Sequence, residues 1–82
     1  MTEAAIRETV FAILRRTAPG SEPEQVGPEE NLREELVIDS FDFLNVIIEL
    51  HKQLGVEIPE TDYGQLTTMA GLIRYLSAKA LR

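Results

Sequence analysis

Ser40 is the side chain of this sequence best placed to take part in chemistry. It follows an acid, Asp39, where a loop-like stretch gives way to the most apolar helical pattern of the chain. A serine at a helix start can cap that helix. It can also carry a phosphodiester, because free backbone N–H groups and the helix dipole favour negative charge there. The sequence therefore predicts either capping or covalent modification at Ser40.

Catalysis by the chain's own side chains is poorly supported. The one histidine, His51, follows Ser40 on the same predicted helix, about 16 Å along the axis at ~1.5 Å per residue. A serine hydrolase needs these two side chains within hydrogen-bond reach. The scattered carboxylates match no zinc or calcium spacing, and the isolated glycines form no phosphate-binding loop. We therefore expect a protein that is not an enzyme and has no metal site of its own.

Length and net charge limit the class of protein that this sequence can encode. The 82 residues suffice for one small domain, residues 1–82. The net charge of −6 disfavours nucleic acid as a partner and favours basic protein surfaces, although it also simply aids solubility. No apolar stretch reaches the ~18 residues of a membrane span. The sequence starts without a signal-like pattern and contains no cysteine. We expect a cytoplasmic monomer that does not insert into membranes.

Apolar periodicity predicts three main helices, with short helical turns between them. The main helices are expected at residues 2–17, 40–54 and 68–80, the last of them capped by Thr67 or Thr68. Short helical turns are expected around 29–35 and 61–66. No strand pattern or internal repeat is present. The sequence thus predicts an all-α fold, a small four-helix bundle of three main helices and one short helix.

A long connection joins the first two main helices, over residues 18–38. Structureless loops of roughly twenty residues are unusual in compact domains and are commonly functional or anchored. Val26, Leu32 and Leu36 are the apolar residues expected to anchor this connection to the core.

The predicted helix 40–54 has two apolar stripes, whereas an amphipathic helix needs one. The first stripe is expected to face the core and contains Phe43, Val46, Ile47, Leu50 and Leu54. The second stripe lies roughly opposite and contains Phe41, Leu44 and Ile48. The second stripe must be covered by the long connection or left for a partner.

The residues around Ser40 form a longer pattern. It consists of Leu32 and Leu36, the motif Asp39-Ser40-Phe41-Asp42, the run Gly55-Val56-Glu57-Ile58-Pro59, and Leu66-Thr67-Thr68. In this order, the stretch from Leu32 to Leu76 resembles the acyl carrier proteins. These are four-helix carriers with an Asp-Ser-Leu motif at the start of their second helix.

The resemblance implies that Ser40 receives a 4′-phosphopantetheine arm from coenzyme A. Acyl groups would be carried on that arm as thioesters, for fatty acid, specialised lipid or polyketide-type biosynthesis. Asp39 would help to hold Mg²⁺ during the modification, or serve as an ordinary N-cap. The implied partners are a phosphopantetheinyl transferase and acyl-loading, acyl-transferring or condensing enzymes. The residues implied to contact them are Phe41, Leu44 and Ile48, with the acids Asp42 and Glu49. Glu57, Glu60 and Asp62 are expected either to supply further docking charge or to form a solvated acidic face.

Two departures from the family pattern concern the pathway. Val37 and Ile38 stand where the family often has Gly-Ala or Gly-Leu-like residues, and their bulk is predicted to stiffen the approach to Ser40. Asn45 and the run 51–53 replace acids that are usual in carriers of bacterial fatty acid synthesis, which weakens attraction to basic docking patches. We therefore expect a dedicated carrier for a specialised route. An aminoacyl or peptidyl carrier, which more often reads Gly-Gly-x-Ser, and an arm-less helical adaptor are the alternatives.

Overall fold

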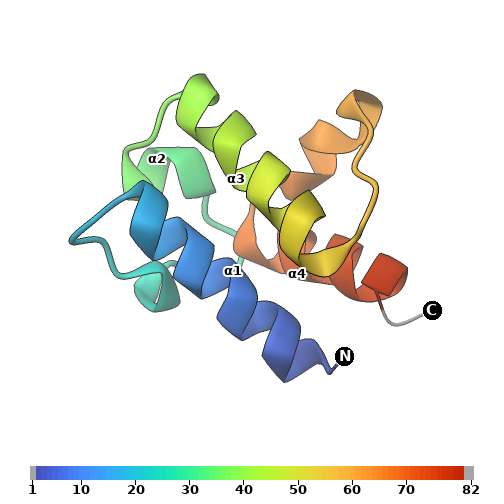
Figure 1. Cartoon of the computed structure of the whole chain (residues 1–82). Helices are drawn as coiled ribbons and strands as arrows, with labels where there is room; N and C mark the ends of the chain where they lie inside the picture. Colours follow the sequence, from blue (N-terminus) through green and yellow to red (C-terminus); the bar gives the residue numbers. More distant parts are fainter. Residues whose placement is uncertain (1, 81–82) are drawn as a thin grey trace.

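The computed structural model describes residues 2–80, and within them every regular element is helical (Figure 1). The order along the chain is α1 (Glu3–Thr17), η1 (Pro23–Gln25), α2 (Leu32–Leu36), α3 (Ser40–Leu54), η2 (Glu60–Leu66) and α4 (Met69–Ala80), where η marks a 3₁₀ helix. The three long helices α1, α3 and α4 and the short α2 confirm the predicted all-α fold.

Local side-chain chemistry sets the ends of the helices. The Thr2 hydroxyl accepts a hydrogen bond from the Ala5 N–H at 3.1 Å at the start of α1. Thr68, rather than Thr67, caps α4 by accepting from the Gly71 N–H at 3.0 Å. Gly55 ends α3 with a φ of 67°, a left-handed conformation that glycine adopts without steric cost. The predicted boundaries of the main helices are therefore close to the observed ones.

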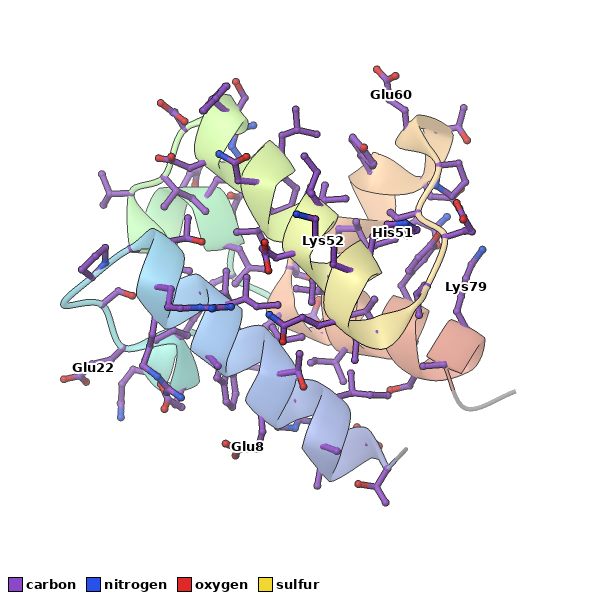
Figure 2. All side chains as sticks on the ribbon, viewed as in Figure 1. Glu8, Glu22, His51, Lys52, Glu60 and Lys79 are labelled. Atoms are coloured by element: carbon purple, nitrogen blue, oxygen red, sulfur yellow. The ribbon has the colours of Figure 1, made fainter. Side chains whose placement is uncertain are left out.

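One apolar core joins the helices. α1 packs against α3 and α4, and η2 packs against α4. The largest fully buried side chains are Ile6, Ile13, Leu14, Leu32, Leu50, Leu66, Leu72 and Leu76, with Val10, Val46 and Pro23. Acidic side chains such as those of Glu8 and Glu22 point away from the bundle (Figure 2). Burial of apolar area is the main stabilising contribution in such a small domain.

The long connection between α1 and α3 is anchored as predicted. Leu32 and Leu36 are buried and Val26 is half-buried against the core. Pro23 is also fully buried, which the sequence pattern did not indicate. The helical turn expected around 29–35 begins only at Leu32, because the Asn31 side chain caps α2 by accepting from the Glu34 N–H at 3.1 Å.

Backbone hydrogen bonds tie this connection to the turn between η2 and α4. The Leu32 N–H donates to the Thr67 carbonyl at 2.8 Å, and the Ala70 N–H donates to the Pro28 carbonyl at 3.0 Å. α2 is therefore joined directly to the end of η2, although the two elements lie far apart in the sequence.

Two features hold η2 against α4. Gly71 allows their close approach, because a Cβ added at this position would lie 2.6 Å from the Gln65 carbonyl oxygen. Across the same interface the Tyr75 hydroxyl donates to an Asp62 carboxylate oxygen at 2.6 Å. Burial, and then the hydrogen bond to Asp62, raise the pKa of Tyr75 to about 12 from an ordinary value of 10.0.

Replacing Tyr75 with phenylalanine is expected to lower the free energy of unfolding by about 1 kcal/mol, the net contribution of one hydrogen bond. The raised pKa of Tyr75 adds a test in alkali. The folded state favours the neutral phenol of Tyr75. Its contribution to the free energy of unfolding is therefore fully present below about pH 10 and is lost as the pH rises through about 12. Urea unfolding measured from pH 8 to 12 should show that the free energy of unfolding falls more steeply with pH in the wild type than in Tyr75→Phe. Parallel losses would contradict this prediction.

Candidate functional site

Asp39, and not Ser40, caps the helix that carries the site. An Asp39 carboxylate oxygen accepts a hydrogen bond from the Asp42 N–H at 2.8 Å. Ser40 is the first residue of α3 itself. The expectation that Ser40 could serve as the cap is therefore wrong, because the preceding aspartate already occupies that position. The Ser40 hydroxyl is consequently not needed to hold the helix.

The Ser40 side chain is exposed and uncommitted. Within residues 2–80 its hydroxyl takes part in no hydrogen bond. The chain has two other serines, and their hydroxyl oxygens are inaccessible to solvent at Ser21 and Ser77. Ser40 is thus the one serine whose hydroxyl is both at a helix start and open to a large partner.

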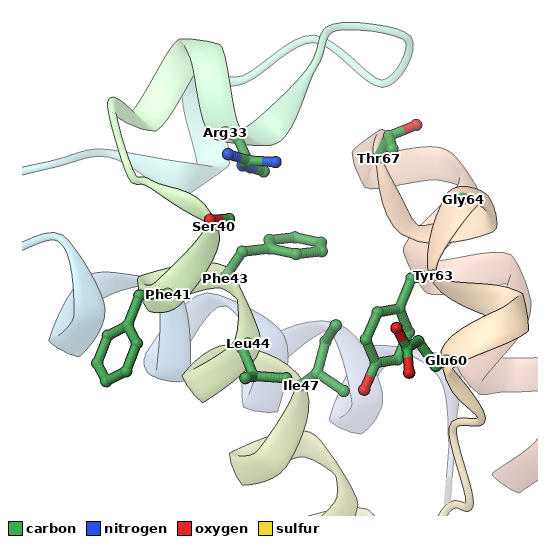
Figure 3. A pocket seen from close by; sticks show the side chains of 10 residues that line it. All are labelled: Arg33, Ser40, Phe41, Phe43, Leu44, Ile47, Glu60, Tyr63, Gly64 and Thr67. Atoms are coloured by element: carbon green, nitrogen blue, oxygen red, sulfur yellow. The ribbon is translucent and has the colours of Figure 1, made fainter.

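A groove of about 670 Å³ runs beside Ser40, between α3 and η2 (Figure 3). Phe43, Leu44 and Ile47 form its floor and the α3 side. Tyr63 and Glu60 stand on the η2 side, across from α3. The groove is mostly apolar, and its polar side chains lie around the edges. Such a surface suits a flexible, largely apolar group attached at Ser40.

The chain reaches Ser40 through a tight turn at the end of α2. The Ile38 N–H donates to the Arg33 carbonyl at 3.0 Å, and the Val37 N–H donates to the Glu34 carbonyl at 3.4 Å, the pattern of a Schellman motif. Val37 adopts a φ of 53°, the left-handed region in which glycine is preferred and a β-branched residue is strained. Its side chain is 87% exposed, whereas Ile38 is buried. The two residues predicted to stiffen the approach to Ser40 therefore have different roles.

Replacing Val37 with glycine is expected to stabilise the protein by about 1 kcal/mol. The strain of a left-handed non-glycine residue costs about 1–2 kcal/mol, and the greater flexibility of glycine in the unfolded chain offsets part of the gain. A rise in melting temperature of roughly 4–8 °C would report it. Val37→Ala is the matched control, since it removes the same exposed apolar group but keeps Cβ. A glycine variant no more stable than the alanine variant would contradict the prediction.

The second apolar stripe of α3 is exposed. Phe41 is 70%, Leu44 40% and Ile48 42% exposed, so the rest of the fold leaves each of them partly uncovered. Exposed Val37 is the fourth large apolar side chain of this kind, and it precedes Phe41 by four residues. We call these four residues, Val37 just before α3 and the other three on it, the α3 apolar face. The sequence indicated three of them. Val37 was missed because its exposure depends on the left-handed turn.

The acids predicted to contact partners have unequal surroundings. Asp42 and Glu49 are half-buried on α3, and a Glu49 carboxylate oxygen lies 3.9 Å from the Lys52 ammonium nitrogen. Glu57 is exposed on the link after α3. Asp62 is engaged by Tyr75, so its carboxylate holds η2 in place and only its remaining lone pairs can face a partner.

Arg33 is a site residue that sequence reasoning missed. It lines the groove together with Ser40, Thr67 and Gly64. Its position between the anchors Leu32 and Leu36 could have drawn attention to it, because a short helix that buries both anchors must expose the residue next to the first. What the sequence could not indicate is that the turn after α2 brings this arginine back beside Ser40.

These features together define a small helical carrier domain, one that offers a serine hydroxyl at a helix start beside an apolar groove. The free Ser40 hydroxyl fits an attached phosphodiester, and the groove fits the arm that follows it. The chain has no cysteine. Its arm would supply the thiol on which acyl groups form thioesters.

Comparison with known proteins agrees with this class. Residues 5–76 match the family described as the phosphopantetheine attachment site. The acyl carrier proteins of Chlorobium phaeobacteroides and Chlorobium luteolum are each 34% identical over 79 residues, covering 96% of this chain and 100% of theirs. The meromycolate extension acyl carrier protein of Mycolicibacterium smegmatis is 30% identical over 76 residues, covering 89% of this chain and 77% of its own.

The chain therefore belongs to the acyl carrier protein family. The predicted function, an acyl carrier with a covalent 4′-phosphopantetheine cofactor for fatty acid or specialised lipid synthesis, is confirmed at that level. The family works with phosphopantetheinyl transferases and acyl-processing enzymes. Within residues 2–80 no helix has the length and apolar character to cross a membrane. The same residues contain no cluster of metal-binding side chains.

Proposed function

We propose that Ser40 is the residue to which the arm is attached. The observation that supports this most directly is its free, exposed hydroxyl at the start of α3, next to the capping residue Asp39 and the groove. Asp39 has one oxygen engaged by the Asp42 N–H. Its other oxygen is available to help hold Mg²⁺ while the transferase works. The protein then presents acyl groups to other enzymes and is not itself a catalyst.

Peptide mapping tests this assignment. The purified apo-protein is incubated with coenzyme A, Mg²⁺ and a broad-specificity phosphopantetheinyl transferase, then digested and analysed by mass spectrometry. The added mass is expected on the peptide that contains Ser40. An increment on a peptide containing Ser21 or Ser77 would overturn the assignment. No increment with any transferase would favour the arm-less adaptor.

The α3 apolar face is proposed as the surface that contacts partner enzymes. Its residues lie on both sides of the attachment site in the chain and expose apolar area that the fold leaves uncovered. The half-buried acids Asp42 and Glu49 flank it, and Glu57 and Asp62 lie on the following segments. Basic rims on partner enzymes would complement these acids and speed association. The carrier itself is proposed to act as a cytoplasmic monomer.

Phe41 should be the largest contributor to that contact, because it is the one aromatic residue of the face and is 70% exposed. Phe41→Ser is expected to raise the KM of a phosphopantetheinyl transferase for the apo-protein about tenfold, which corresponds to ~1.4 kcal/mol of binding. Both kcat and the melting temperature should stay near the wild-type values. Glu8→Ser, on the exposed side of α1, is the control. Equal KM values for the two variants would contradict the docking role.

We further propose that the carrier serves a specialised lipid or polyketide-like route. The support is electrostatic. Glu49 lies beside Lys52 and within 4.0 Å of Arg16, and Asn45, His51 and Lys52 supply no acids to α3. Steady-state assays would compare the turnover of this carrier by a housekeeping ketosynthase with the turnover of that enzyme's cognate carrier. Slower turnover is expected here, and equal turnover would refute it.

A further inference from the structure

Arg33 is the groove residue whose role the proposed attachment at Ser40 leaves unexplained. Its side chain lines the groove in the same region as Ser40 (Figure 3). Among residues 2–80, no carboxylate oxygen lies within 4.0 Å of its guanidinium nitrogens, although the neighbouring stretch is rich in acids. It is also the one cationic side chain among the lining residues of the groove. An unpaired cation therefore stands at the edge of a mostly apolar groove.

The fold fixes Arg33 relative to Ser40 from two sides. The Arg33 carbonyl accepts the Ile38 N–H at 3.0 Å, which folds the chain back just before Asp39 and Ser40. The adjacent Leu32 N–H donates to the Thr67 carbonyl at 2.8 Å, which holds the start of α2 at the η2 side of the groove. These bonds hold the backbone of Arg33 close to that of Ser40, so its side chain starts near the point where an anion attached to Ser40 would emerge.

We propose that the Arg33 guanidinium binds the phosphodiester that the arm introduces at Ser40, and that this ion pair directs the arm into the groove between α3 and η2. The inference rests on the proposed attachment at Ser40. A planar guanidinium can donate two parallel hydrogen bonds to phosphate oxygens. The free N–H groups at the start of α3 add to the attraction.

The charge on the other wall favours the phosphodiester over an anionic acyl group as the partner of Arg33. Glu60 lines the groove across from α3, beside Tyr63. A carboxylate at the free end of a cargo lying deeper in the groove would approach Glu60 and be repelled. The phosphodiester is held at the Ser40 end, away from that acid. The groove is therefore arranged for a negative charge at its entrance and an uncharged chain within it.

NMR on the intact apo- and holo-proteins tests the proposal. The Arg33 Nε–H resonance should shift when the arm is attached, whereas that of Arg74, an exposed arginine of α4, should not. Cross-peaks from the arm's methyl groups to Phe43 and Tyr63 should weaken about two- to fivefold in holo Arg33→Gln, as expected for an ion pair open to solvent. Raising the NaCl concentration should weaken the same cross-peaks in the wild type. Arg74→Gln is the matched control.

The outcomes separate the inference from the assignment of the site. If mass spectrometry shows no arm on Ser40, both are overturned. If the arm is attached but the Arg33 resonance and the cross-peaks do not respond, only the role of Arg33 is overturned. Loading the arm with an uncharged butyryl group or with a succinyl group, which carries a carboxylate, tests whether Arg33 binds the cargo and not the phosphodiester. An Arg33 shift that appears only with succinyl would assign the arginine to the cargo carboxylate and refute the ion pair with the phosphodiester.

Discussion

Ser40→Ala is expected to abolish attachment of the arm completely while leaving the fold intact. Attachment needs the hydroxyl oxygen, and no other serine offers an accessible one, because those of Ser21 and Ser77 are inaccessible to solvent. The fold should not respond, since Asp39 supplies the cap of α3 and the Ser40 hydroxyl makes no hydrogen bond within residues 2–80. The free energy of unfolding should change by less than about 0.5 kcal/mol, as for other exposed positions without a structural role.

Two measurements check this result. Intact-protein mass spectrometry after co-expression with a transferase should show the arm on the wild type and on Ser77→Ala, and none on Ser40→Ala. Urea unfolding of the three apo-proteins should show that Ser40→Ala keeps the wild-type midpoint. Residual modification of the Ser40→Ala protein would mean that a different residue carries the arm. A large loss of stability would mean that the hydroxyl has a structural role not accounted for by the Asp39 cap.

The second large effect is expected at Leu32, where replacement by alanine should lower the free energy of unfolding by about 2–5 kcal/mol. Leu32 is fully buried and belongs to a helix of only five residues, so few other contacts can compensate for a cavity there. Total stabilities of small domains are about 5–15 kcal/mol. The variant should therefore be partly unfolded at moderate temperature, and α2 should lose its protection against amide exchange first.

Leu44→Ala is the matched control for Leu32→Ala, because it removes the same atoms from a leucine that is 40% exposed. Its cost should be smaller, about 1 kcal/mol, since two fifths of its surface already meets solvent and little cavity is left behind. Thermal unfolding should separate the two variants by roughly 4–8 °C for each kcal/mol of difference. Similar melting temperatures would show that α2 contributes little to the core and that Arg33 is not held rigidly.

The sequence predicted the main helices well, because their apolar residues recur with a helical period and their ends carry strong signals. The caps Thr2 and Asp39 and the stop at Gly55 are local features that need no knowledge of the rest of the chain. The exposed stripe Phe41, Leu44 and Ile48 could also be predicted, since one helix cannot bury two opposite faces in a small bundle.

The parts that could not be predicted depend on contacts between distant segments. The position of Arg33 beside Ser40 follows from a left-handed turn at Val37, and a valine gives no signal for such a turn. Asp62 was expected to face partners, but its bond to Tyr75 depends on how η2 lies on α4. The burial of Pro23 likewise depends on packing that no periodic pattern records.

The two ties around the groove have a consequence for the size of what it can hold. The hydrogen bond from Leu32 to Thr67 joins α2 to the η2 side near Ser40, and residues 55–59 join α3 to η2 through the chain itself. An acyl chain longer than the groove would leave its outer carbons in water, at a cost of about 0.8 kcal/mol for each CH₂. The holo-protein should thus become steadily less soluble, and quicker to hand over its cargo, once that length is exceeded.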